Sequence, residues 1–238
     1  MKILCLNIEG EKHQEKVLAL LKKEKPAVAC LQEITKATFD HYVRDLSMQG
    51  FFAPMTVRQG KGELGKQWGV AILTDRPAQL ILIKYYDNFS LDYPEMRGRR
   101  GERPLAVVLV IAIGETAFRI ATTHFTWTPD GGVTEEQRIN LASLLEAAEE
   151  YSSLLLCGDF NAPRGTEIHT KLSQAFHDPL PLTIETTLDP ILHRSGKQLV
   201  VDGFFITRDL VMSNIYTIEG ISDHCAVVGE IKYPLQGY

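Results

Sequence analysis

The sequence lacks long hydrophobic runs. No stretch approaches the roughly 18 apolar residues of a membrane-spanning helix. The apolar N-terminal segment from Ile3 to Ile8 is interrupted by Asn7 and is too short for a signal peptide. We therefore expect a cytoplasmic protein with no membrane partner.

Cysteine is also scarce. The chain of 238 residues has 4 cysteines, and none of them belongs to a CxxC pair. Each one lies inside or beside an apolar run, which is typical of a buried, reduced thiol. The residues concerned are Cys5, Cys30, Cys157 and Cys225.

An excess of positive charge is missing too. The formal net charge of -5 argues against a protein that binds nucleic acid through a broad basic surface. The strongest local exception is the segment from Met96 to Arg103, in which glycines separate the arginines. Two interpretations stay open for it: a solvated surface loop, or a contact of Arg99 and Arg100 with a substrate phosphate.

Internal repeats and low-complexity tracts are absent, and 45% hydrophobic with 23% charged residues is ordinary for a globular protein. The length suits one domain built from two packed sheets, so we expect a single domain over residues 1–238.

Apolar periodicity predicts an α/β chain. Helices are expected at residues 12–25, 35–48, 134–151 and 166–176. Strands are expected at residues 2–8, 27–31, 51–57, 68–74, 78–86, 104–113, 115–125, 154–156, 199–207, 211–218 and 225–231.

Three local arrangements follow from this pattern. The first two strands flank a helix, which predicts that they run parallel. The turn Asp75-Arg76-Pro77 predicts an antiparallel hairpin of strands 68–74 and 78–86. The helix at 134–151 is expected to bury a stripe that contains Ile139, Leu141, Leu144, Leu145 and Ala148.

The most informative stretch is Cys157-Gly158-Asp159-Phe160-Asn161-Ala162-Pro163, which follows the apolar run Leu154–Leu156. It indicates a buried strand that ends in a loop. Side chains two apart on an extended backbone point to the same side, so Asp159 and Asn161 could reach one ligand together. The alternative is an Asx turn, in which one of these side chains only satisfies the loop backbone.

Polar residues lie in or beside other apolar runs as well. The set is Asn7, Glu33, His124, Asp159, Asn161, Asp202, Asp223 and His224. Isolated carboxylates beside buried strands are costly unless they are paired, hydrated or bound to a metal, so one shared site is the simplest explanation.

The chemistry of this set suits a phosphate ester. Carboxylate and amide oxygens are ligands for Mg²⁺, and no Cys-rich or HExxH zinc pattern occurs. A base for water and histidine donors for phosphoryl oxygens complete a hydrolytic site. The missing GxxxxGK[ST] motif argues against a P-loop.

His224 needs a carboxylate partner to hold it charged. Adjacent strand residues point to opposite sides, so Asp223 is a poor candidate. We predict that Asp202 pairs with His224. The alternative is that Asp202 is an ordinary surface acid.

With these residues considered, the chain resembles the endonuclease/exonuclease/phosphatase family of metal-dependent phosphoesterases. Four segments carry the resemblance in the family's order: Met1–Ile8 with its Asn, Leu31-Gln32-Glu33, Gly158-Asp159-Phe160-Asn161, and Ser222-Asp223-His224. The resemblance implies a DNase I-like four-layer sandwich, in which two mixed β-sheets are flanked by helices.

The resemblance also implies roles for individual residues. Glu33 would bind Mg²⁺, or Mn²⁺ as an alternative, with Asn7 and Asp223 near the metal. Asp159 would activate the attacking water, and Asn161 would hold a phosphoryl oxygen. Asp202 would pair with His224, whose imidazolium would stabilise the developing negative charge.

The segment Thr122-Thr123-His124-Phe125 bears on the substrate. It is similar to the branches that cleave tyrosyl-DNA links, small phosphodiesters, phospholipids or inositol phosphates, rather than to the abasic-site endonucleases. The resemblance implies that His124 is a phosphate ligand. Trp127 either stacks on a base or an aromatic leaving group, or anchors its loop.

The expected function is Mg²⁺-dependent hydrolysis of a phosphoester, foremost a phosphodiester, by a monomeric enzyme whose substrate could include DNA. One alternative is a DNA repair nuclease that uses the arginine segment as its basic contact. The other is a catalytically silent binding module of the same fold.

Overall fold

The computed structural model describes residues 1–57, 66–85, 107–113, 118–129 and 131–232. In this part of the chain the backbone forms two sheets and the helices that cover them. The arginine segment, with Arg99 and Arg100, lies outside the described residues, so its two interpretations stay open.

Among the described residues the first sheet has six strands, in the order β10-β11-β1-β2-β4-β3. Its strands are β1 (Lys2–Asn7), β2 (Val28–Thr35), β3 (Gln49–Val57), β4 (Gln67–Thr74), β10 (Val211–Ile218) and β11 (Ala226–Lys232). β1 and β2 run parallel, which confirms the prediction from the strand-helix-strand pattern, and their ends place Asn7 opposite Gln32.

The second sheet has five strands in the same part of the chain, in the order β5-β6-β7-β8-β9. Its strands are β5 (Ala78–Tyr85), β6 (Val107–Ile113), β7 (Phe118–His124), β8 (Leu154–Asp159) and β9 (Asp202–Ile206). Where β7 and β8 end and β9 begins, a row of paired residues crosses these three strands: His124 lies opposite Asp159, and Asp159 lies opposite Asp202. The register therefore brings three predicted site residues side by side.

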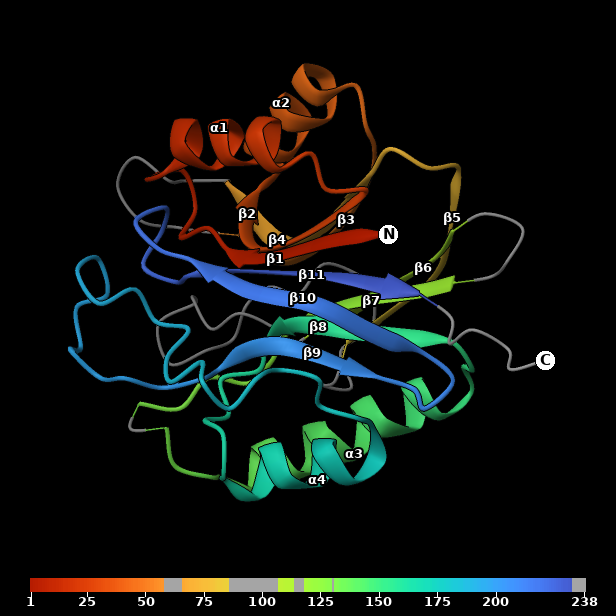
Figure 1. The fold of residues 1–238 in the computed structure, drawn as a ribbon, viewed down its shortest axis with the longest axis vertical. Helices are drawn as coiled ribbons and strands as arrows, with labels where there is room; N and C mark the ends of the chain where they lie inside the picture. The colour runs from red at the N-terminus through yellow and green to blue at the C-terminus, as the bar shows by residue number, and fades with distance from the viewer. Residues whose placement is uncertain (58–65, 86–106, 114–117, 130, 233–238) are drawn as a thin grey trace.

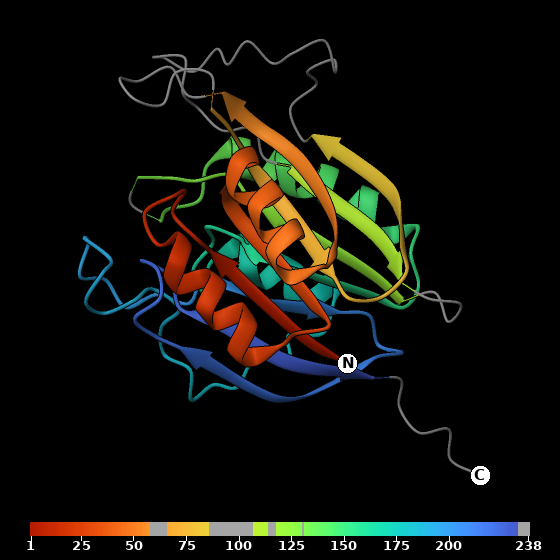
Figure 2. The ribbon, with the colours of Figure 1, turned by 90° about the horizontal axis from the view of Figure 1, so that it is seen from above.

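Helices cover the outer face of each sheet, which gives the four layers visible in Figure 1. They are α1 (Gln14–Glu24), α2 (Lys36–Leu46), α3 (Glu135–Glu149) and α4 (Glu167–Ala175). α1 and α2 lie across the first sheet (Figure 2), and α3 and α4 lie on the second. The predicted α/β sandwich of two mixed sheets flanked by helices is confirmed. None of the helices in the described residues is long and apolar enough to cross a membrane.

Apolar side chains fill the spaces between all the layers. One buried cluster, which includes Ile3, Ile72 and Phe204, lies between the two sheets. Others pack each sheet against its helices. The cysteines are buried free thiols, as predicted. Burial raises the pKa of Cys5 and Cys157 well above the usual value for a thiol, so both stay protonated.

The predicted hairpin of strands 68–74 and 78–86 is wrong. β4 pairs with β2 and β3 in the first sheet, whereas β5 pairs with β6 in the second. The turn at residues 75–77 therefore carries the chain from one sheet to the other. β4 is buried along nearly its whole length, and β5 is an edge strand with mostly half-buried or exposed residues. A short turn between two strands fits either arrangement, and burial decides between them.

The predicted stripe on the third helix is also wrong at one position. Ile139 is 60% exposed. The buried face of α3 includes Gln137 and Asn140 instead. Gln137 Nε2 donates to the carbonyl of Thr126 at 2.8 Å, and Asn140 Nδ2 donates to the Thr126 hydroxyl at 2.6 Å. The buried face of α3 therefore carries two polar side chains, and their hydrogen bonds support the loop after β7.

A glycine in β8 allows two strands to approach closely. Gly158 has φ 151°, and a Cβ at this position would overlap the carbonyl oxygen of Thr123. We expect Gly158→Ala to lower the free energy of unfolding by about 3 kcal/mol, because the backbone on both sides would have to move. Urea denaturation of the purified variant measures this loss.

The matched control is Gly203→Ala in the neighbouring strand. There a Cβ would meet only Leu180 Cδ2, at an ordinary 3.6 Å. We expect this control to change the free energy of unfolding by less than about 1 kcal/mol. Equal losses in the two variants would contradict the steric argument.

Candidate active site

A cavity of about 630 Å³ opens at the end of the sandwich where β1, β7 and β8 finish and β9 begins. Six of the eight predicted strand-end residues line it: Glu33, His124, Asp159, Asn161, Asp223 and His224. Two further predicted residues, Asn7 and Asp202, are hydrogen-bonded to members of this group. The structure therefore brings the predicted strand-end residues together.

Asp159 lies at the floor of this cavity and is only 2% exposed. Its Oδ2 accepts a hydrogen bond from Asn7 Nδ2 at 3.1 Å. The same oxygen lies 3.5 Å from His124 Nε2 and 3.8 Å from His224 Nε2. One carboxylate oxygen thus faces two imidazoles and an amide from both sheets.

The other oxygen of Asp159 makes an Asx turn. Asp159 Oδ1 accepts from the backbone N–H of Asn161 at 2.9 Å. Asn161 itself has φ 49° and has left the strand, so the expected extended geometry between the two residues is wrong. Its Nδ2 donates to the carbonyl of Phe125 at 2.9 Å, and the side chain still lines the cavity. Asp159 and Asn161 thus form an Asx turn and also line the same cavity, so the two interpretations of this stretch are compatible.

His224 and Asp202 form a buried pair. His224 Nδ1 lies 2.8 Å from Asp202 Oδ2, as expected from the sequence. Burial acts to lower the pKa of His224, but the charges of Asp202 and Asp159 outweigh it and raise the pKa well above the usual value. Burial raises the pKa of Asp202 to about 6. At neutral pH the pair is therefore imidazolium and carboxylate.

Asn7 connects the two sheets through its amide group. Its Nδ2 lies within hydrogen-bonding distance of Glu33 Oε1 at 3.3 Å as well as of Asp159 Oδ2. Its Oδ1 accepts the backbone N–H of Glu9 at 3.1 Å. Glu33 lies in the irregular stretch of β2 between Leu31 and Ile34 and has φ 54°, and its side chain lines the cavity. Asn7 thus positions two carboxylates that would otherwise repel each other.

Three carboxylate side chains that could supply oxygen donors to a cation line the cavity. Glu9, Glu33 and Asp223 line it together. Burial raises the pKa of Asp223, and the nearby charges of Glu9 and Glu33 act in the same direction. A divalent cation among these groups would offset their mutual repulsion, and carboxylate oxygens suit Mg²⁺. The donor set therefore fits the metal expected from the sequence.

Trp127 is 62% exposed and lines the cavity, which favours the stacking interpretation over that of a partly buried loop anchor. The loop that carries it is supported from below by Gln137 and Asn140, through the Thr126 hydrogen bonds described above. The indole is therefore available on the cavity wall.

Sequence reasoning missed part of the cavity wall. Glu9 lines it, and so do His193, Arg194 and Lys197 from the long segment between α4 and β9. The three residues of the long segment follow no predicted strand, so the strand-end argument did not select them, whereas Glu9 directly follows the predicted strand at residues 2–8 and was overlooked. The available signal was the length of this segment, since long irregular connections often carry function.

Residues 4–224 match the model of the Endonuclease/Exonuclease/phosphatase family. Because the match covers most of this chain, the chain belongs to the family. Its members are generally phosphoesterases or nucleases, and typically depend on a divalent metal. A search of curated protein sequences finds no significant match.

Solved structures share the fold at low identity. A functionally unknown conserved protein from Enterococcus faecalis V583 is 18% identical, with a TM-score of 0.75, over 98% of this chain and 100% of that one. The human Nocturnin catalytic domain with bound sulfate is 17% identical, with a TM-score of 0.68, over 98% and 94%. D. rerio TDP2 complexed with a single-stranded DNA product is 12% identical, with a TM-score of 0.68, over 98% of each chain.

Proposed function

We propose that the protein is a metal-dependent phosphoesterase that hydrolyses a phosphodiester by attack of water. The observation that carries the proposal is the position of Asp159, whose Oδ2 lies 3.5 Å from His124 Nε2 and 3.8 Å from His224 Nε2 at the cavity floor. A carboxylate base beside two imidazoles matches the needs of phosphoryl transfer to water.

In this mechanism Asp159 accepts the proton of the attacking water. Its Oδ1 is engaged by the backbone of Asn161, so Oδ2 is the oxygen that faces the water. The Asn7 amide orients Oδ2 and keeps it from turning away. The water is thus held by a carboxylate whose rotation is restricted on both sides.

His224, His124 and Asn161 hold the phosphoryl oxygens. The imidazolium of His224 donates from Nε2, because its Nδ1 is engaged by Asp202. His124 presents Nε2 to the same space, and the Asn161 amide retains one N–H beyond its bond to Phe125. These donors stabilise the negative charge that grows on the phosphoryl oxygens in the transition state.

Glu33 and Asp223 would hold the cation, and Mg²⁺, with Mn²⁺ as the alternative, would supply positive charge that polarises a phosphoryl oxygen. Asn7 lies near this cation, with its side-chain oxygen accepting the backbone N–H of Glu9 and retaining a second lone pair. Its role in the proposal is to position Glu33 and Asp159.

Trp127 gives the substrate a surface to stack on. It is exposed on the cavity wall beside the proposed phosphate site, where a base or an aromatic leaving group could lie against the indole. This observation, together with the likeness to TDP2, which was crystallised with single-stranded DNA, makes a nucleic acid the second candidate substrate.

Hydrolysis of a substrate panel tests the proposal. The panel contains bis-p-nitrophenyl phosphate, p-nitrophenyl phosphate, a 5′-tyrosyl oligonucleotide and an abasic duplex. We expect cleavage of a phosphodiester with Mg²⁺, and a rate roughly a thousandfold lower after chelation of the metal, because the cation contributes several kcal/mol to the transition state.

Other outcomes separate the alternatives. Turnover that falls steeply with salt would favour a nucleic acid substrate held through several phosphate contacts. Metal binding with no cleavage of any substrate would favour the binding module. Metal-independent turnover would sink the proposed mechanism.

A further inference from the structure

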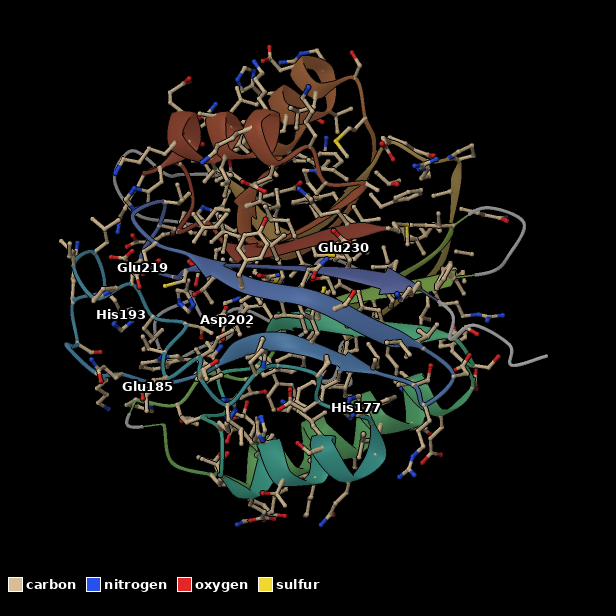
Figure 3. All side chains as sticks on the ribbon, viewed as in Figure 1. His177, Glu185, His193, Asp202, Glu219 and Glu230 are labelled. Atoms are coloured by element: carbon tan, nitrogen blue, oxygen red, sulfur yellow. The ribbon has the colours of Figure 1, made fainter. Side chains whose placement is uncertain are left out.

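A second group of potential metal ligands lies beside the proposed Mg²⁺ site. His193, Asp223 and His224 each offer one ligand atom, and these atoms lie within 4.8 Å of one another. The two imidazole rings are 5.9 Å apart and nearly perpendicular, at 88°. All three side chains line the cavity. Figure 3 shows His193 at the same end of the sandwich as Asp202.

The segment that carries His193 is attached to the backbone of the other two residues. The N–H of Asp189 donates to the carbonyl of Asp223 at 2.9 Å, and Leu188 pairs with His224 in an antiparallel bridge. The N–H of His193 then donates to the carbonyl of Asp189 at 3.1 Å. This continuous path of hydrogen bonds sets the position of His193 relative to Asp223 and His224.

The Asp189 side chain stiffens the same segment. Its Oδ1 accepts from the N–H groups of Ile191 and Leu192 at 3.0 and 2.8 Å, and its Oδ2 accepts from Gly220 at 2.6 Å. These bonds lower the pKa of Asp189 against the effect of its burial, so it is charged at neutral pH. The turn before His193 is therefore internally bonded rather than free to swing.

One nitrogen of each histidine is already engaged. His224 Nδ1 lies 2.8 Å from Asp202, and His193 Nδ1 lies 2.9 Å from the Ser195 hydroxyl. Histidines that bind metals characteristically use one ring nitrogen for the metal and the other for such a partner. The arrangement leaves Nε2 of both rings for a ligand in the cavity, and a metal at His224 Nε2 takes the place of the proton there.

We propose that His193, Asp223 and His224 form a second cation site that takes Zn²⁺ in preference to Mg²⁺. Two imidazole nitrogens and one carboxylate, with an open position towards the cavity, are the ligand set of a zinc site. Mg²⁺ prefers oxygen ligands and is served by the neighbouring carboxylates. The two sites share Asp223 and compete for it.

Occupancy of this site blocks turnover. Zn²⁺ would bind His224 Nε2 by displacing its proton into solvent, so this nitrogen could no longer donate to the phosphoryl oxygen. The shared Asp223 would also be withdrawn from the Mg²⁺ site. Zn²⁺ is therefore an inhibitor of the Mg²⁺-dependent reaction. This consequence rests on the proposed function, whereas zinc binding itself does not.

Calorimetric titration of Zn²⁺ alone into the metal-free protein tests the site without any substrate. We expect one binding event, and an affinity about tenfold or more lower in His193→Ala, because one of three ligands is lost. His193→Gln has a similar bulk and serves as the second variant should the alanine variant fold poorly. Equal zinc affinity in wild-type protein and both variants overturns the proposal.

His177→Ala is the matched control. His177 is exposed and pairs with Ile206, at the opposite end of β9 from Asp202, and Figure 3 shows it far from His193. Zinc affinity and Mg²⁺-dependent activity should be unchanged in this variant. A loss of zinc affinity equal to that in His193→Ala would place the bound zinc elsewhere and overturn the proposal.

Two further measurements identify the ligands and the consequence. Zn²⁺ should shift the side-chain ¹⁵N resonances of His193 and His224 in NMR spectra, and leave those of His177 in place. Zinc should inhibit hydrolysis of the substrate identified by the panel, with an inhibition constant about tenfold or more higher in His193→Ala. Zinc binding without inhibition would refute the shared site. Absence of any hydrolysis would refute the proposed function and leave the binding result standing.

Discussion

Replacing Asp159 by Asn is expected to lower kcat by about 10³- to 10⁴-fold, the upper part of the range for loss of a general base. The amide has nearly the same shape and can still accept from the backbone of Asn161, so the Asx turn survives. It cannot take a proton from water. Single-turnover kinetics on the preferred phosphodiester, with circular dichroism to confirm the fold, measure the effect.

The control is Asp178→Asn. Asp178 is partly buried and, like Asp159, lies near a histidine, with its Oδ2 3.3 Å from His169 Nε2, but it does not line the cavity of about 630 Å³. Its replacement should leave kcat within about twofold of the wild-type value, because its side chain does not face the cavity that holds the reacting groups. A similar rate for Asp159→Asn and wild-type protein would remove Asp159 from the mechanism.

Replacing His224 by Gln is the second large effect, with kcat expected to fall by about 10²- to 10³-fold, the magnitude for loss of one donor to the transition-state charge. Asp202→Asn should lower kcat by a smaller factor, because it removes only part of the transition-state stabilisation that His224 provides. The double variant should be no worse than His224→Gln alone, since Asp202 acts through His224. A double variant whose loss of transition-state stabilisation equals the sum of the two single losses would contradict this coupling.

The pH dependence gives an independent readout of the same pair. The mechanism needs His224 charged, and its raised pKa keeps it charged at neutral pH, so activity is present below that pKa and is lost as pH rises through it. Asp202→Asn removes the nearest negative charge and lowers the pKa of His224. The alkaline limb of the pH-rate profile should move to lower pH. An unchanged limb would assign it to another group.

Much of this architecture could be predicted from the sequence because strand and helix periodicities are local. The sequence predicts the order β1, α1 and β2 with the two strands parallel, and the structure confirms this. The hairpin after β4 failed because the same short turn suits a hairpin and a crossing between sheets. The choice depends on which sheet buries β5, and that is a property of the whole fold.

The site could be predicted where strands supply its residues. Asp159 and His124 were found because polar groups that end buried strands need an explanation. His193 escaped, since its place in the cavity depends on hydrogen bonds between its segment and residues 223 and 224, which are distant in sequence. Such long-range anchoring leaves no periodic trace. The conformation of Asn161 was also missed, because a positive φ at a non-glycine residue is not visible in the sequence.

The site has two parts that differ in how freely their length can change. One is the row of His124, Asp159 and Asp202, which crosses three hydrogen-bonded strands. A slip of any of these strands by one residue would turn its site residue to the other face, so an insertion there would disrupt the row. The Trp127 loop and the segment around His193 lie outside the named strands, and connecting segments in general accept changes in length more readily than strands do. New specificities can therefore arise by rebuilding the cavity wall while the row stays as it is.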